Sequence, residues 1–90
     1  LSLWFFNDYD ILGMYFYYVG LLALKENRLS DALFSFKKAL DYDRKAENTR
    51  GILKDMIQIA EVYRLQGNTA MQQYYEQLVE QTLDKNQIPR

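Results

Sequence analysis

The sequence predicts an all-α protein made of antiparallel helix hairpins. Apolar residues recur at spacings of three and four along most of the chain, which is the period of one helix face. The 90 residues include one proline and four glycines, whereas a β-sandwich or barrel needs turn residues about every eight to twelve positions. Because a chain of this length supports a single hydrophobic core, we expect residues 1–90 to form one domain.

Polar breaks at 27–29, 44–47 and 66–68 divide the chain into four expected helices. The first runs from about Asp8, whose carboxylate can cap the free amides at a helix start, to about Glu26. Apolar side chains cover nearly every side of this segment. We therefore expect the first helix to be buried all round.

The second helix is expected to begin at Ser30, a good N-cap, followed by Asp31, where the helix dipole favours a negative charge. Its apolar residues form one stripe, with Lys37 and Lys38 pointing the other way. The members of the stripe are Ala32, Leu33, Phe36, Ala39 and Leu40. This helix is predicted to pack through one side.

The third and fourth helices show the same one-sided pattern. The third runs from about Asn48 to Leu65 and the fourth begins near Asn68 or Thr69, either of which can cap it. The third stripe comprises Ile52, Met56, Ile59, Ala60 and Tyr63. The fourth directs inward Met71, Tyr75, Leu78, Val79 and Leu83.

The composition excludes most classes of enzyme. The chain has no cysteine and no histidine, which removes disulfides, thiolate nucleophiles, catalytic triads and the common zinc and haem ligands. Paired carboxylates catalyse proton transfer only in a desolvated pocket. We expect solvated charges on exposed faces at Asp41, Asp43, Asp55, Glu61, Glu76 and Glu80. The sequence thus predicts a non-catalytic protein without metal or cofactor.

The charge and hydropathy patterns argue against nucleic acid and membrane as partners. The net charge of −1 provides no broad positive field. A helix-turn-helix reading would need Arg50, Lys54 and Arg64 to converge on one face. The apolar run 11–24 is shorter than the roughly twenty residues that span a bilayer. We expect no membrane insertion and a cytoplasmic location, with a periplasmic one left open.

The two halves of the sequence correspond to each other. At an offset of forty residues the third helix aligns with the first, and the small residues Gly20 and Ala60 coincide. At an offset of thirty-nine the fourth helix aligns with the second, which indicates the loss of one residue in the later turn. Two helices approach closely where one carries a small residue and a large residue of the other fills the notch.

These residues resemble the tetratricopeptide repeat, a two-helix unit with an aromatic, aliphatic and glycine in one helix and alanines around an aromatic in the other. The match lies at Phe16, Val19, Gly20, Ala32, Phe36 and Ala39. It covers residues 13–44 well and 52–83 more loosely, and the stretch 44–51, expected to lengthen the link, is similar to the long variant of the repeat. The resemblance implies a right-handed superhelix of stacked hairpins (an α-α superhelix), with further repeats flanking it in the parent chain.

The resemblance also implies a protein-binding scaffold or adaptor. Members of this family usually hold an extended peptide or partner helix on the concave side, lined by the first helix of each pair. The positions on that side are Met14, Tyr17, Leu21, Leu24, Lys25, Lys54, Ile57, Glu61 and Arg64. Members that bind a chaperone's terminal carboxylate carry lysine and asparagine where this chain has Tyr17 and Leu21, which argues against that ligand.

Two alternatives stay open for the same residues. The apolar positions of that side, among them Tyr17 and Leu21, are either a seam to a neighbouring repeat or a homodimer contact. Residues 1–10 are an aromatic lead-in or the end of a preceding helix. The expected oligomer contacts are Trp4, Phe5, Phe6 and Tyr9. Alternatively, the chain is a sensor or regulatory segment of a larger signalling protein, such as a histidine kinase, a phosphatase or a transcription regulator.

Overall fold

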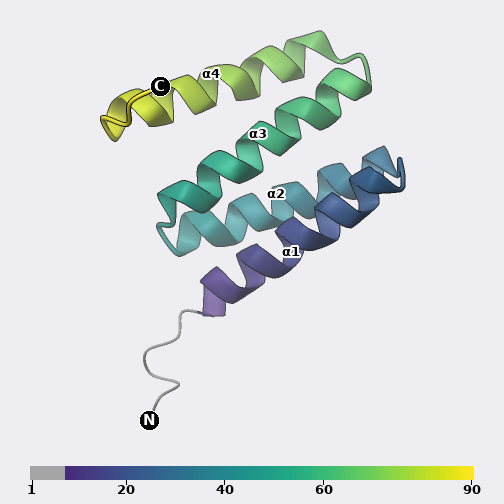
Figure 1. Ribbon diagram of the computed structural model, residues 1–90, viewed down its shortest axis with the longest axis horizontal. Helices are drawn as coiled ribbons and strands as arrows, with labels where there is room; N and C mark the ends of the chain where they lie inside the picture. The colour runs from purple at the N-terminus through teal and green to yellow at the C-terminus, as the bar shows by residue number, and fades with distance from the viewer. Residues whose placement is uncertain (1–7) are drawn as a thin grey trace.

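The computed structural model describes residues 8–90, and this part of the chain consists of helices and turns without a strand. Its helices are α1 (Asp8–Lys25), α2 (Leu29–Lys45), α3 (Thr49–Leu65) and α4 (Thr69–Lys85). Each helix packs against the next, so that the chain runs as a zigzag from α1 at one edge to α4 at the other (Figure 1). The prediction of an all-α protein is confirmed.

The three turns between helices share one length and one geometry. They span 26–28, 46–48 and 66–68, and the middle residue of each has a positive φ: Asn27 at 59°, Glu47 at 54° and Gly67 at 74°. The amide of the next residue donates to a carbonyl five positions back, as from Asn48 to Asp43 at 2.9 Å. This is the Schellman ending of a helix, and α4 ends in the same way, with Gln87 at a φ of 55°.

These turns correct two expectations about the repeat. The link between α2 and α3 is not lengthened over 44–51, because α2 continues through Arg44 to Lys45 and the turn then takes three residues like the others. Nor is a residue lost between α3 and α4, since α4 starts and ends forty positions after α2. The forty-residue spacing therefore comes from three helices of 17 residues, α2, α3 and α4, joined by turns of three residues.

The helix starts follow from the turns. The side-chain oxygens of Asn48 and Asn68 accept hydrogen bonds at 3.1 Å from the amides of Gly51 and Met71. The predicted cap at Asn68 is confirmed, and Asn48, expected only as the approximate start of the third helix, is also a cap. The predicted cap at Ser30 is wrong. The Schellman geometry puts the N-cap directly after the positive-φ residue, and at α2 that position is Arg28, whose side chain makes no capping bond.

The core lies between α1, α2 and α3, with Phe36 of α2 fully buried at its centre. A Cβ atom on Gly20 of α1 would come within 2.6 Å of the Phe36 ring, so the glycine is what lets α1 approach α2. The predicted notch between a small and a large residue is confirmed. The remaining buried apolar side chains include Ala23, Ala32, Ala39, Leu40, Met56, Ile59, Val62 and Tyr63.

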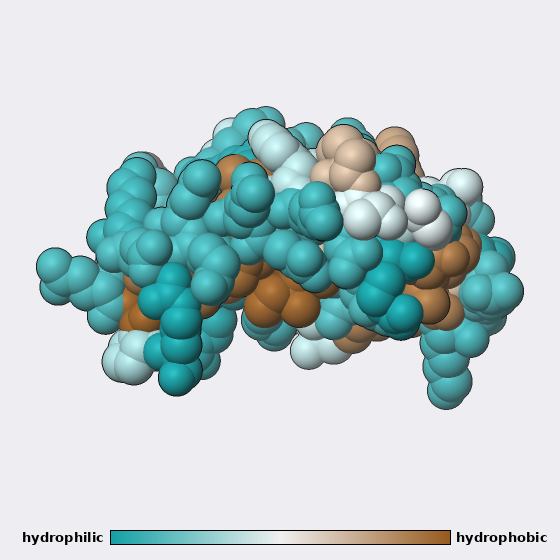
Figure 2. Space-filling model, turned by 90° about the horizontal axis from the view of Figure 1, so that it is seen from above, coloured by the Kyte–Doolittle hydropathy of each residue, from teal (hydrophilic) through white to brown (hydrophobic). Residues whose placement is uncertain are grey.

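The two outer helices are covered on one side only. In α1 the buried residues are Gly13, Gly20 and Ala23, so the expectation of a helix buried all round is wrong. The reason is the linear order of the array, which gives α1 its cover from α2 and a small contact with α3. No residue of α4 is fully buried. Of its predicted inward residues, Met71, Tyr75, Leu78 and Val79 are half-buried against the core, and Leu83 is half-buried. Seen from the α4 edge, the surface is mostly hydrophilic (Figure 2).

Candidate functional site

The predicted concave residues do not form one continuous groove. Met14 and Ile57 are exposed, whereas the apolar side chains Tyr17, Leu21 and Leu24 are half-buried and pack against the core. The charged members Lys25, Lys54 and Arg64 are exposed and Glu61 is half-exposed. Part of the predicted binding surface is therefore used within the chain itself.

The structure brings the predicted residues together in two separate places. Met14, Tyr17 and Lys54 meet between α1 and α3, where the Lys54 ammonium lies 4.8 Å from the centre of the Tyr17 ring. Ile57 and Glu61 instead line a hollow of about 450 Å³ between α3 and α4. The carboxylate of Glu61 is paired with Arg64 at 2.7 Å, a local contact on the surface of α3. Neither hollow includes Leu21, Leu24 or Lys25.

An exposed apolar surface lies on the outer side of α1, and Met14 is its only member that the sequence analysis named as a binding residue. Its members are between 49% exposed at Ile11 and 59% exposed at Tyr15. We call this surface the α1 stripe; it comprises Ile11, Met14, Tyr15, Tyr18 and Leu22. The sequence carried a signal for it, because Ile11, Tyr15, Tyr18 and Leu22 follow one another at spacings of four, three and four. Because α1 is apolar on two faces, the sequence analysis expects both faces to be buried, whereas the structure leaves one of them exposed.

The predicted oligomer contacts are described only in part. Trp4, Phe5 and Phe6 lie outside the described residues. Tyr9 is 44% exposed, and its ring lies near that of Tyr42 at 6.2 Å between centroids, with the Lys45 ammonium 5.6 Å from the Tyr9 ring centre. Tyr9 is thus engaged with α2, although almost half of its surface faces solvent.

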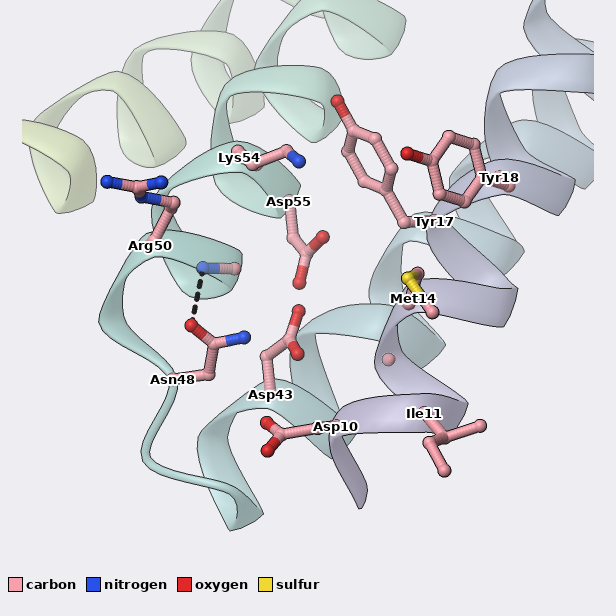
Figure 3. A pocket seen from close by; sticks show the side chains of 12 residues that line it. Asp10, Ile11, Met14, Tyr17, Tyr18, Asp43, Asn48, Arg50, Lys54 and Asp55 are labelled. Carbon is pink, nitrogen blue, oxygen red and sulfur yellow. Dashed lines mark hydrogen bonds between the residues drawn. The ribbon is translucent and has the colours of Figure 1, made fainter. Parts of the chain in front are cut away.

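A second feature missed by the sequence reasoning is a pocket of about 290 Å³ where the start of α1, the end of α2 and the start of α3 meet. Two buried carboxyl groups point toward each other in it, Asp43 from α2 and Asp55 from α3 (Figure 3). We call it the aspartate pocket. Its other walls include Asp10, Met14, Tyr17, Tyr18, Asn48, Arg50 and Lys54.

The backbones of two helices enclose the Asp43 carboxyl group. A Cβ atom on Gly13 of α1 would collide with the Asp43 carboxyl oxygen, and one on Gly51 of α3 would come within 2.6 Å of its carboxyl carbon. Both positions therefore need glycine for α1 and α3 to close around this side chain. Asp43 is 3% exposed as a result.

Asp55 is the most unusual group in the pocket. It is 1% exposed, and neither of its carboxyl oxygens has a hydrogen-bond partner among residues 8–90. Burial raises the pKa of Asp55 from 3.8 to about 9, with a further contribution from the neighbouring Asp43 carboxyl and a smaller opposing one from Lys54. At neutral pH the Asp55 carboxyl group is therefore protonated. The expectation that Asp43 and Asp55 are solvated charges is wrong.

Residues 8–90 contain neither a candidate metal site nor a candidate membrane-spanning helix. Nowhere in residues 8–90 are three acidic side chains arranged to hold a metal ion. No helix in the same range combines the length and the apolar character that crossing a membrane requires.

The comparisons with known proteins return no relative. No protein-family model matches the chain, and neither a curated protein nor a solved structure matches it.

Proposed function

We propose that this chain is a non-catalytic protein-interaction module, built as two hairpins of the tetratricopeptide-repeat kind, and that the α1 stripe is its principal contact surface. The single observation that supports this is the exposure of the stripe: five large apolar side chains, each about half exposed, lie along one helix face. Contiguous apolar surface of this kind is rare on soluble monomers unless it binds something.

The contrast with α4 supports the same proposal. The outer face of α4 carries mainly glutamine and carboxylate side chains, among them Gln73, Gln77, Glu80 and Asp84. The residues after α4 fold back on it, with Arg90 paired to Asp84 at 2.6 Å and to Glu80 at 3.2 Å. In helical arrays a polar outer face closes one end of the stack. The apolar face of α1 is suited to a further helix, either from a partner or from a second copy.

Light scattering across a hundredfold dilution tests this proposal, with Tyr15→Glu and Leu22→Glu as variants of the stripe. We expect the parent chain to associate at high concentration and both variants to shift toward the monomer, because a charge in an apolar contact is costly to desolvate. Tyr74→Glu is the matched control, since Tyr74 is a single exposed aromatic on α4. It should leave association unchanged.

The proposal fails if the α1 stripe neither mediates association nor binds an apolar ligand. That outcome would be a parent that stays monomeric over the whole range and binds the apolar dye ANS no more strongly than Leu22→Glu does. An unchanged helical signal in the circular dichroism spectrum of each variant shows that the variant is folded, so that any loss of association comes from the lost contact.

A further inference from the structure

The aspartate pocket holds two buried acidic groups, Asp43 and Asp55, that form no ion pair with any cation of residues 8–90. The ion pairs of residues 8–90 are confined to the surface and involve other residues, so none of them reaches Asp43 or Asp55. An unpaired carboxyl group buried to 99% is expensive in free energy unless it is neutralised. The pocket therefore needs a partner for these groups, either a proton or a positively charged group.

The charged and titratable groups around the pair come from all three helices. α1 contributes Asp10, Tyr17 and Tyr18, and α3 contributes Arg50 and Lys54. The Lys54 ammonium lies over the Tyr17 ring at 4.8 Å from its centre instead of pairing with a carboxylate. The two basic side chains stand on the α3 side of the pocket, and the carboxyls of Asp43 and Asp55 lie between them and the side chains of α1 (Figure 3).

We propose that the aspartate pocket receives one basic side chain of the bound partner, an arginine or a lysine. This inference rests on the proposed function as an interaction module and names the partner's chemistry. A guanidinium group fits best because its planar fork can donate to two carboxylates at once and can stack on an aromatic ring. Met14 and Tyr17 provide the apolar wall for its hydrocarbon stem. The cavity of about 290 Å³ has room for one such side chain.

Binding of the basic group displaces the proton that Asp55 holds at neutral pH. The pKa of Asp55, raised to about 9 by burial and by Asp43, makes this exchange observable. Below that pH, each unit of increase raises the deprotonated fraction of Asp55 by up to about tenfold and strengthens binding by the same factor. A guanidinium keeps its own charge throughout this range, so its titration does not obscure the effect.

The test is a titration of the full chain with Nα-acetylarginine amide, followed by the carbon-13 methyl signals of methionine. The chain has three methionines: Met14 lines the pocket, whereas Met56 is buried in the core and Met71 packs from α4. We expect the Met14 signal to shift alone, with binding about tenfold stronger at pH 8 than at pH 7. Nα-acetylcitrulline amide, the uncharged analogue of the same shape, should leave the Met14 signal in place.

Variants of the pair complete the experiment. Asp55→Asn and Asp43→Asn keep the size of the side chain and remove its negative charge, so each should weaken binding at least tenfold and abolish the pH dependence. Asp41→Asn, an exposed position on the same helix as Asp43, is the matched control and should bind like the parent. Unchanged Met56 and Met71 signals in each variant show that it is folded.

Three results would each overturn the inference: equal binding of the citrulline compound, unchanged arginine binding in Asp55→Asn, or no shift of Met14 at pH 8.5 up to 100 mM ligand. Such a failure is separable from a failure of the proposed function. Tyr15 and Leu22, the positions that test the α1 stripe, do not line the aspartate pocket. If the stripe variants abolish association while arginine does not bind, the interaction module stands and the basic-side-chain pocket does not.

Discussion

Two aspartates, Asp43 and Asp55, occupy buried helix positions that usually hold apolar residues. Asp43 lies three and seven residues after Leu40 and Phe36, and is therefore on the buried stripe of α2. Asp55 lies four residues before Ile59, on the buried stripe of α3. The helical period alone would have placed both side chains inside. Their charge led to the opposite expectation, because an isolated carboxylate is rarely buried.

The Asp55 carboxyl group should make the stability of the protein depend on pH. Its pKa is raised from 3.8 to about 9 by burial and by Asp43, so between these values the folded chain holds a proton that the unfolded chain releases. As far as this group is concerned, the free energy of unfolding is highest below about pH 4. It falls as the pH rises toward 9, by at most about 1.4 kcal/mol per pH unit.

Urea denaturation of the parent and of Asp55→Asn at pH 6, 7 and 8 measures this effect. The amide cannot ionise, so the free energy of unfolding of the variant should change less with pH than that of the parent. Asp41→Asn should keep the parent's slope. A parent whose stability is as flat as that of Asp55→Asn over this range would contradict the assignment of a proton to the pair.

At the scale of the element, each helix is defined by the turn before it. The positive-φ residue and the Schellman bonds end one helix, and the next residue becomes the N-cap of the following one. The cap at Asn68 was predicted from the sequence, whereas Asn48 was predicted only as the approximate start of α3. The start of α2 was predicted wrongly. Serine is a better N-cap than arginine, so Ser30 was chosen, but the turn geometry makes Arg28 the N-cap residue.

Replacing Asn68 by alanine should destabilise α4. The change removes the hydrogen bond from the Met71 amide to the Asn68 side chain, now 3.1 Å long, and the free energy of unfolding should fall by about 1 kcal/mol. The measurement is urea denaturation followed by circular dichroism. Arg28→Ala alters the same position of the first turn, where no capping bond exists, and should cost less than about 0.5 kcal/mol. Arg28→Ala also removes the two exposed ion pairs of Arg28, with Glu26 and Asp31. Equal losses in the two variants would therefore show that the Asn68 cap contributes no more than these surface pairs.

At the scale of the whole molecule, stability should decrease from the centre of the array toward its α4 edge. The buried side chains are concentrated in α2 and α3, whereas α4 has none and touches only α3. Local unfolding is easiest where few apolar contacts are lost. We therefore expect hydrogen exchange to show lower protection for the amides of α4 than for those of α3. Uniform protection across the four helices would instead indicate that they unfold as one cooperative unit.

Local features of this molecule can be predicted from its sequence, whereas features that depend on how the helices pack cannot. The helix number, the stripes of α2 and α3 and the contact between Gly20 and Phe36 follow from local periodicity and side-chain size. The environment of α1 does not, because its residues 11–22 are apolar on two faces and the sequence does not say which face has a neighbour. The aspartate pocket needed three helices to meet, so its composition emerges only from the packed array.

The order in which the helices pack also bears on how quickly the chain reaches its native state. Each helix contacts the one that follows it in the sequence, and the one contact that skips a neighbour, between α1 and α3, is small. Chains dominated by such local contacts close only short loops as they fold, and helical proteins of this kind fold on the order of microseconds to milliseconds. Any of the hairpins can begin the process, because none waits for a distant segment to arrive.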